Sequence, residues 1–175
     1  MYGGKILAHP QVRTSFPFIV LIPIAPFGLP WAVPRPAIPR PEALPLAMDT
    51  LHSVQKMFNV DPRKIYITGY SMGGIGVYAA ISRYKDVFAA AIPTDAGWDP
   101  AQIIEMDDIP LWIFQGEIDD QMPVTVTRTL ASLLKQAGRE VYYTEYPRQG
   151  HGAWVSAYEN PELWYWLINR AKKAD

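Results

Sequence analysis

The chain has 175 residues, 49% hydrophobic and 19% charged, which suffices for one globular domain with a core and is too short for two. Its 16 Lys and Arg residues are balanced by 17 Asp and Glu residues, so it lacks the basic field that binds a nucleic-acid backbone. It contains no cysteine, which excludes disulfides, thiolate metal sites and a cysteine nucleophile.

The first long apolar stretch, residues 16–29, is interrupted by three prolines and a glycine. No basic segment followed by an apolar run and a small-residue cleavage site precedes it, so neither a signal peptide nor a membrane span is predicted. We therefore predict a single domain over residues 1–175, with no membrane and no nucleic acid among its partners.

In chain order, short apolar runs bounded by turn residues alternate with stretches of helical periodicity. This alternation is typical of an α/β fold, in which a mostly parallel sheet has helices on both faces. We predict about five strands, at residues 17–24, 64–68, 88–92, 110–114 and 140–146. Four predicted helices cover residues 47–58, 72–84, 123–137 and 161–173, the last of them capped by Asn160.

The segment 26–45 carries seven prolines between the first predicted strand and the first predicted helix. Because proline lacks the backbone N–H and fixes φ, we expect this segment to run extended over the surface as a rigid crossover. Long loops in compact domains are often functional, so a second interpretation makes it a wall over a site, with Trp31 touching the substrate.

The sequence Gly69-Tyr70-Ser71-Met72-Gly73-Gly74 lies directly between a predicted strand and a predicted helix. It matches the G-x-S-x-G nucleophile elbow, whose sharp turn exposes a serine hydroxyl at a helix N-terminus. We expect a Cβ at Gly69 or Gly73 to strike the neighbouring strand or helix, and Ser71 to be the nucleophile. The backbone N–H of Met72 is then a candidate donor to an oxyanion.

A serine nucleophile needs a base that removes its proton, and the sequence offers three histidines. His9 precedes a proline before the sheet, and His52 lies within a predicted helix. His151 lies between two glycines, in a loop just beyond the last predicted strand, where open α/β sheets place their sites. We expect His151 to be the base.

An orienting carboxylate should lie between Ser71 and His151 in the chain, again just after a strand. The predicted strand at 110–114 is followed by Glu117, Asp119 and Asp120, and any of the three could orient the histidine. Asp95 and Asp99, after the preceding strand, are weaker candidates and are interpreted as turn residues.

With these motifs in place, residues 59–173 resemble the α/β-hydrolase superfamily. The resemblance is narrower to esterases and peptidases related to polyhydroxybutyrate depolymerases, feruloyl esterases and prolyl oligopeptidases. Residues 61–74 look like that family's strand and elbow, and residues 143–154 look like its histidine segment. Residues 115–123 resemble its H-G-x-x-D-x-x-V-P loop, which implies that Asp119 is the acid.

The chain departs from this family in two respects. Gln115 stands where the family usually has histidine, and we expect little consequence from it. The resemblance also implies that residues 17–24 form the fourth strand of an eight-stranded sheet, whose third strand would lead into a second oxyanion donor that has no counterpart before Ser71.

Two arrangements would accommodate this departure. The strands at 17–24 and 64–68 could pair directly, with an N–H near residues 25–28 as the second donor. Alternatively, a second copy of the chain could cover the exposed sheet edge as a homodimer, because an uncovered edge invites association.

Taken together, the sequence predicts a reduced α/β-hydrolase fold and a carboxylesterase that acts on small-molecule or polymeric esters. Neither a metal nor another cofactor is implied, because clustered histidines and cysteines are absent. The predicted substrate contacts are Tyr70, Trp98, Trp154 and Trp31. A serine peptidase of the prolyl-oligopeptidase kind, and an inactive binding protein on the same scaffold, remain as alternatives.

Overall fold

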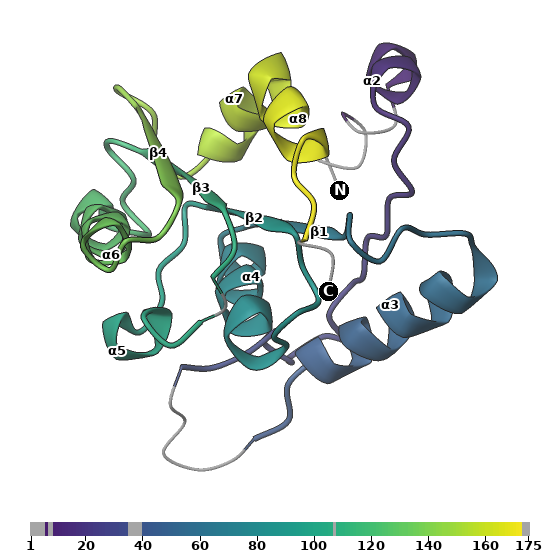
Figure 1. Cartoon of the computed structure of the whole chain (residues 1–175). Coiled ribbons are helices and arrows are strands. Elements are labelled where there is room, and N and C mark those ends of the chain that lie inside the picture. Colours follow the sequence, from purple (N-terminus) through teal and green to yellow (C-terminus); the bar gives the residue numbers. More distant parts are fainter. Residues whose placement is uncertain (1–5, 7–8, 35–39, 107, 173–175) are drawn as a thin grey trace.

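The computed structural model of the chain describes residues 6, 9–34, 40–106 and 108–172. Its centre is a parallel sheet of four strands, in the order β1-β2-β3-β4 (Figure 1). These strands are β1 (Tyr66–Tyr70), β2 (Ala90–Thr94), β3 (Leu111–Gly116) and β4 (Val141–Tyr146). The α/β class and the parallel sheet predicted from the sequence are confirmed.

Of the five predicted strands, the first in chain order, at residues 17–24, is wrong. These residues form no strand, and β1 is the outermost strand on that side of the sheet among the described residues. Pro17 and Pro23 supply no N–H for a ladder, and the side chains of Ile19, Ile22 and Ile24 are exposed. The predicted direct pairing of this segment with residues 64–68 is therefore also wrong. The prediction relied on the apolar composition of the segment, which does not by itself establish that it pairs with another strand.

The four predicted helices are present as α3 (Leu44–Met57), α4 (Met72–Arg83), α6 (Val124–Gln136) and α8 (Pro161–Ile168). Asn160 caps α8, since its side-chain oxygen accepts from the N–H of Glu162, and α8 ends at Ile168, short of the predicted end at residue 173, which lies outside the described residues. Three shorter helices among the described residues were not predicted: α2 (Pro10–Ser15), α5 (Pro100–Ile103) and α7 (Ala153–Glu159). Each is too short for its apolar residues to show a helical period.

The core has two layers, one on each face of the sheet. Helices α3, α4, α5 and α6 cover one face, whereas α7, α8 and the segment around Phe16 cover the other (Figure 1). Successive strand residues alternate between them: Leu111 and Ile113 pack in the first layer, Trp112 and Phe114 in the second. Both faces are thus buried, which explains why the strands are near-continuous apolar runs.

The proline-rich segment is described only in part, since residues 35–39 lie outside the described residues. The extended conformation predicted for residues 26–45 is wrong at its end, because Leu44 and Pro45 belong to the first turn of α3, where the missing N–H of Pro45 removes no helical hydrogen bond. Ala32 and Ala43 are buried, so the described ends of this segment are anchored to the core.

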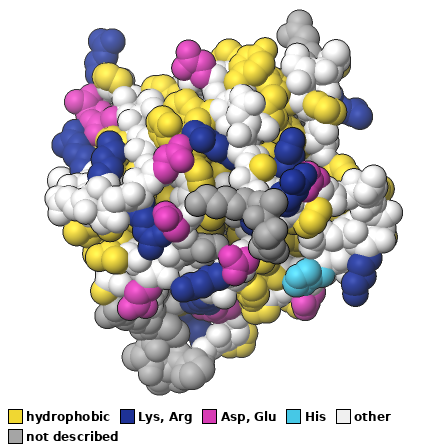
Figure 2. Space-filling view, viewed as in Figure 1, with side chains coloured by type: hydrophobic (Ala, Val, Ile, Leu, Met, Phe, Trp, Pro, Cys, Tyr) yellow, Lys and Arg dark blue, Asp and Glu magenta, His cyan; other side chains and the backbone are white. Residues whose placement is uncertain are grey.

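Lys and Arg side chains are interspersed with Asp and Glu over the face seen in Figure 2, consistent with the net charge of −1. Among the helices in the described part of the chain, none combines the length and the apolar composition that a membrane crossing requires.

Candidate active site

One residue beyond the carboxyl end of each of the four strands lies in the same small region of the structure. Ser71 follows β1, Asp95 follows β2, Asp119 lies in the turn after β3, and His151 lies in the turn after β4. Because the strands are parallel, their carboxyl ends share one edge of the sheet, and these side chains meet there.

Ser71 occupies a strained turn between β1 and α4. Its φ of 53° and ψ of −120° lie outside the regions that residues other than glycine usually adopt. The turn is held by the N–H of Ser71, which donates to the carbonyl of Thr94 at 3.0 Å. The strained backbone thus directs the hydroxyl away from the sheet at the N-terminus of α4.

The glycines around Ser71 differ in how closely they are approached. A Cβ at Gly69 would overlap the carbonyl of Gly73, and one at Gly74 would overlap the Cβ of Ala96. A Cβ at Gly73 would meet no atom within 4 Å, so the expected clash at that position is wrong. The tight strand–helix approach at this turn needs Gly69 and Gly74.

His151 and Ser71 are in direct contact. The Nε2 atom of His151 lies 2.8 Å from the Oγ of Ser71, within the range of a hydrogen bond. The side chain of His151 is only 8% exposed. The hydroxyl of Tyr70 donates to the carbonyl of His151 at 2.9 Å, which fixes the backbone of this turn against β1.

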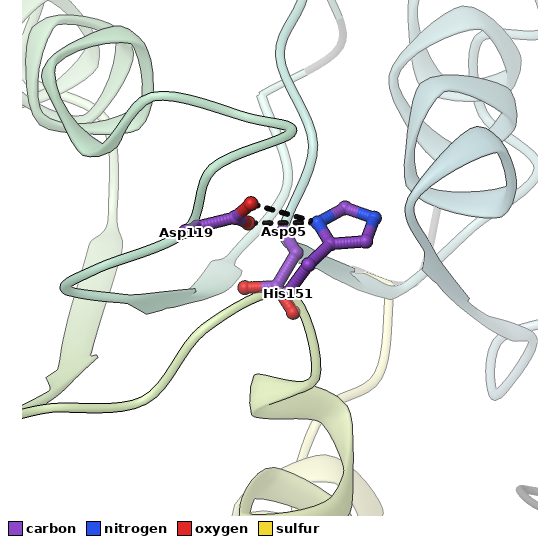
Figure 3. A group of neighbouring side chains, drawn as sticks. All are labelled: Asp95, Asp119 and His151. Atoms are coloured by element: carbon purple, nitrogen blue, oxygen red, sulfur yellow. Dashed lines mark hydrogen bonds and ion pairs between the residues drawn. The ribbon is translucent and has the colours of Figure 1, made fainter.

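The opposite nitrogen of the His151 ring contacts Asp119. Nδ1 lies 2.8 Å from Oδ2 and 3.0 Å from Oδ1 of that carboxylate (Figure 3). Of the other two acids in this loop, Glu117 accepts instead from the N–H of Arg148, and Asp120 is exposed. The structure thus brings together Ser71, His151 and Asp119.

Asp119 is held as an ionised acceptor. Its Oδ1 accepts from the backbone N–H groups of Gln121 and Met122, each at 2.9 Å. Burial opposes ionisation, but the N–H of Met122, the ring of His151 and the N–H of Gln121 outweigh it and lower the pKa of the Asp119 carboxyl. A carboxylate facing Nδ1 keeps the proton on that nitrogen, which leaves Nε2 free to accept from Ser71.

Gln115, which stands where the family usually has histidine, also contacts this arrangement. The side chain is fully buried, and its Nε2 donates to Oδ2 of Asp119 at 2.9 Å and to the carbonyl of Met122 at 3.0 Å. Sequence reasoning treated the position as structural because a glutamine at a strand end carries no motif of its own. The only available signal was its place four residues before the candidate acid.

Asp95, interpreted from the sequence as a turn residue, is fully buried. It adopts a positive φ of 46°, a conformation in which aspartate is among the better tolerated residues. Oxygen atoms of Asp95 and Asp119 and a ring nitrogen of His151 lie within 4.8 Å of one another (Figure 3). Such a group could hold a cation in principle, but the carboxylate oxygens already accept backbone and imidazole N–H donors.

The four predicted aromatic contacts lie in different surroundings. The ring of Tyr70 lies 4.9 Å from the His151 ring and 5.9 Å from the Trp154 ring, measured between centroids. Trp98 is 5% exposed and belongs to the core layer that also contains the buried residues of α4 and α6. Trp31 packs against α4, where a Cβ at Gly76 would approach the indole to 3.0 Å.

The arrangement supplies the parts that nucleophilic catalysis requires. A serine hydroxyl, an imidazole and a carboxylate are joined in sequence by hydrogen bonds of 2.8 Å. The serine lies at the N-terminus of α4, where backbone N–H groups and the helix dipole favour developing negative charge.

Comparisons with known proteins identify a family and similar folds. Residues 39–166 match the model of the dienelactone hydrolase family. The structure is similar to the crystal structure of a thermostable esterase, with a TM-score of 0.87 and 32% sequence identity. The match covers 95% of this chain and 48% of the esterase, so the chain spans about half the length of that relative.

More distant similarities concern the fold alone. An acylaminoacyl peptidase of Pyrococcus horikoshii aligns with a TM-score of 0.60 at 18% identity, over 66% of this chain and 24% of the peptidase. The esterase PE8 aligns with a TM-score of 0.56 at 17% identity, over 71% of this chain and 56% of the esterase. No protein with a curated functional description matches the sequence.

Proposed function

The chain belongs to the dienelactone hydrolase family of the α/β-hydrolase superfamily, and from this premise we propose that it is a serine hydrolase that cleaves carboxylic esters. The observation that carries the proposal is the hydrogen-bonded series from Ser71 through His151 to Asp119. The similarity to a thermostable esterase, at 32% identity, supports an ester as the substrate class.

In the proposed reaction, Ser71 is the nucleophile and His151 the base. The Oγ of Ser71 attacks the ester carbonyl carbon while Nε2 of His151 takes the hydroxyl proton. Collapse of the tetrahedral intermediate breaks the bond to the alkoxy group, and His151 returns the proton to the departing alcohol. Water activated by His151 then hydrolyses the acyl-enzyme and regenerates the Ser71 hydroxyl.

Asp119 would hold the imidazole in the tautomer that accepts at Nε2 and stabilise the imidazolium that forms during each step. The lowered pKa of its carboxyl keeps this charge in place at neutral pH. Gln115 would support that role by donating to Oδ2.

The oxyanion of the intermediate would accept from the backbone N–H of Met72, at the first turn of α4. Loss of one oxyanion donor typically lowers turnover by about 10² to 10³. If Met72 acts alone, we expect slow turnover that favours esters with good leaving groups. A second donor near residues 25–28 would give faster turnover on unactivated esters.

Two of the aromatic candidates fit an acyl or aryl contact better than the others do. The ring of Tyr70 lies beside that of His151, the ring of Trp154 lies beside that of Tyr70, and neither residue is fully buried. Trp98 is enclosed in the core and Trp31 rests on α4, so their expected effect is on packing. We therefore propose Tyr70 and Trp154 as the first residues to vary when acyl preference is measured.

The direct test is hydrolysis of short-chain and medium-chain p-nitrophenyl esters by the protein and by Ser71→Ala and His151→Ala. We expect activity in the parent and a loss of roughly 10⁴-fold or more in each variant, because the members of a triad act as a unit. Matched controls are Ser132→Ala and His52→Ala, both exposed on helices outside the site, which should retain full activity.

A parallel assay with a p-nitroanilide of a blocked peptide tests the peptidase alternative. Amide cleavage that exceeds ester cleavage would replace the proposal by a serine peptidase. Equal residual rates in the parent, Ser71→Ala and His151→Ala would overturn it in favour of a binding protein on a hydrolase scaffold.

A further inference from the structure

Asp95 is a buried ionisable residue that the proposed reaction does not use. It follows the last residue of β2, is fully buried and lies at the carboxyl edge of the sheet beside Asp119 and His151 (Figure 3). Burying a carboxylate costs free energy unless its oxygen atoms accept hydrogen bonds, so the donors to Asp95 indicate which parts of the structure it stabilises.

Both oxygen atoms of Asp95 accept from the backbone, and the two donors belong to different turns. Oδ1 accepts from the N–H of Gly116 at 2.9 Å, at the end of β3 where the turn to Asp119 begins. Oδ2 accepts from the N–H of Ala153 at 2.8 Å, in the first residue of α7 and two residues beyond His151. One carboxylate thus links the turn that carries the acid to the turn that carries the base.

The turn that carries Asp119 and the turn that carries His151 pack closely against each other, so a shift of one turn would also displace the side chain on the other. A Cβ at Gly116 would overlap the carbonyl oxygen of Gly150, and the N–H of Ile118 donates to the carbonyl of Gln149 at 3.0 Å. Asp95 adds a third point of attachment, on the side of β2. In Figure 3 its carboxylate is directed away from the imidazole and toward the beginning of α7, as these hydrogen bonds require.

The charge of Asp95 also lies close to the ring that becomes positive during catalysis. Acceptance of two N–H donors, one on each oxygen, is the geometry of an ionised carboxylate. Burial, together with the charge of Asp119, raises the pKa of the Asp95 carboxyl above its ordinary value, and the N–H groups of Gly116 and Ala153 and the ring of His151 oppose this shift. The titratable groups around the ring are Asp95, Asp119 and the hydroxyl of Tyr70, whose pKa is raised by burial and by both carboxylates.

We propose that Asp95 is a positioning residue of the site, which ties the Asp119 turn to the His151 turn and adds a second negative charge beside the imidazole. This inference rests on the proposed function, because it concerns how Ser71, His151 and Asp119 are kept in register. It assigns Asp95 no contact with the substrate. Its expected effect is therefore on turnover and its pH dependence, and only weakly on KM.

The test is Asp95→Asn, compared with the parent over a range of pH. Asparagine tolerates a positive φ as aspartate does, so the backbone strain is unchanged. The substitution replaces one acceptor oxygen of Asp95 by an amide NH2 group that faces a backbone N–H donor, and it removes the negative charge. We expect kcat to fall about 10- to 100-fold with little change in KM, because small displacements of catalytic groups are costly.

The pH profile separates this role from a purely structural one. Loss of a negative charge beside the ring disfavours the imidazolium, so the acidic limb of the kcat/KM profile should move to lower pH in Asp95→Asn. The matched control is Asp99→Asn, in the same loop, where aspartate accepts from the N–H of Ala101 and asparagine caps equally well. Its kcat and pH profile should equal those of the parent.

A folded Asp95→Asn protein with unchanged kcat and an unchanged acidic limb would overturn the inference, whatever its thermal stability. If this variant does not fold, carbon-13 NMR of the Asp95 carboxyl in the parent decides. We expect the carboxyl to be ionised throughout the pH range of activity, and a neutral carboxyl there would overturn the inference. An inactive but folded parent would instead contradict the proposed function.

Discussion

Gln115 and Asp95 show at the residue scale what a sequence reveals about a site and what it does not. Ser71, His151 and Asp119 lie in short motifs, and the structure brings these three residues into contact. Gln115 and Asp95 each make two hydrogen bonds at the site, and these partners are brought together only in the folded chain. Sequence reasoning therefore found the residues with local signatures and missed those that support them.

The hydrogen bond from Gln115 to Asp119 predicts a measurable effect on activity. Gln115→Met preserves side-chain length and removes the donors to Oδ2 of Asp119 and to the carbonyl of Met122. Hydrogen bonds to charged groups contribute about 1.5 to 3 kcal/mol, so we expect kcat/KM to fall about tenfold or more. Steady-state kinetics on a p-nitrophenyl ester measures it.

Gln136→Met is the matched control for this substitution, because Gln136 is exposed on α6 and its amide donates only to the Ser132 hydroxyl among the described contacts. Its kcat/KM should equal that of the parent. An unchanged kcat/KM in Gln115→Met would show that the amide does not support Asp119.

At the scale of elements, most strands and helices were predictable because the signals for each lie within its own short stretch of sequence. Strands β1 to β4 and helices α3, α4, α6 and α8 follow from apolar runs, helical periods and caps in the sequence. The segment 17–24 has the same apolar composition but two prolines and no partner strand. Strand pairing is a property of two segments, so composition alone mispredicted it.

The junction between β1 and α4 predicts opposite results for two neighbouring glycines. In Gly69→Ala the new methyl would overlap the backbone of Gly73, so we expect the free energy of unfolding to fall by about 3 kcal/mol or more. In Gly73→Ala the methyl meets no atom within 4 Å, and alanine favours the helix by up to about 1 kcal/mol, so stability should be kept or raised.

Urea unfolding followed by circular dichroism measures both glycine variants against the parent. Equal destabilisation by the two substitutions would mean that the close approach of β1 to α4 at Gly69 is not as described.

At the scale of the whole molecule, no strand pairs with the outer edge of β1 among the described residues. A groove of about 710 Å³ lies between β1, the helices α3 and α4, and residues 17–23, with mainly apolar side chains along it. Sheet edges that are unpaired and apolar invite association with another chain. With direct pairing by residues 17–24 absent, we propose as the occupant a second copy of the chain, the other of the two arrangements that the sequence left open.

This proposal predicts a concentration-dependent dimer in sedimentation velocity. Ile19→Lys places a charge on the groove and should shift the protein toward monomer. Leu46→Lys is the matched control, because Leu46 is also 55% exposed but does not line the groove, and it should not change the association. A parent that is monomeric at every concentration would contradict a homodimer through this edge.

The central claim is that Ser71 is a nucleophile activated by His151 and Asp119. Intact-mass and peptide mass spectrometry after exposure to a fluorophosphonate tests it directly, because this reagent phosphonylates activated serines irrespective of acyl preference. We predict one adduct per chain, located on Ser71, absent in Ser71→Ala and strongly slowed in His151→Ala. No adduct on the folded parent, or an adduct on another residue that persists in Ser71→Ala, would contradict the account.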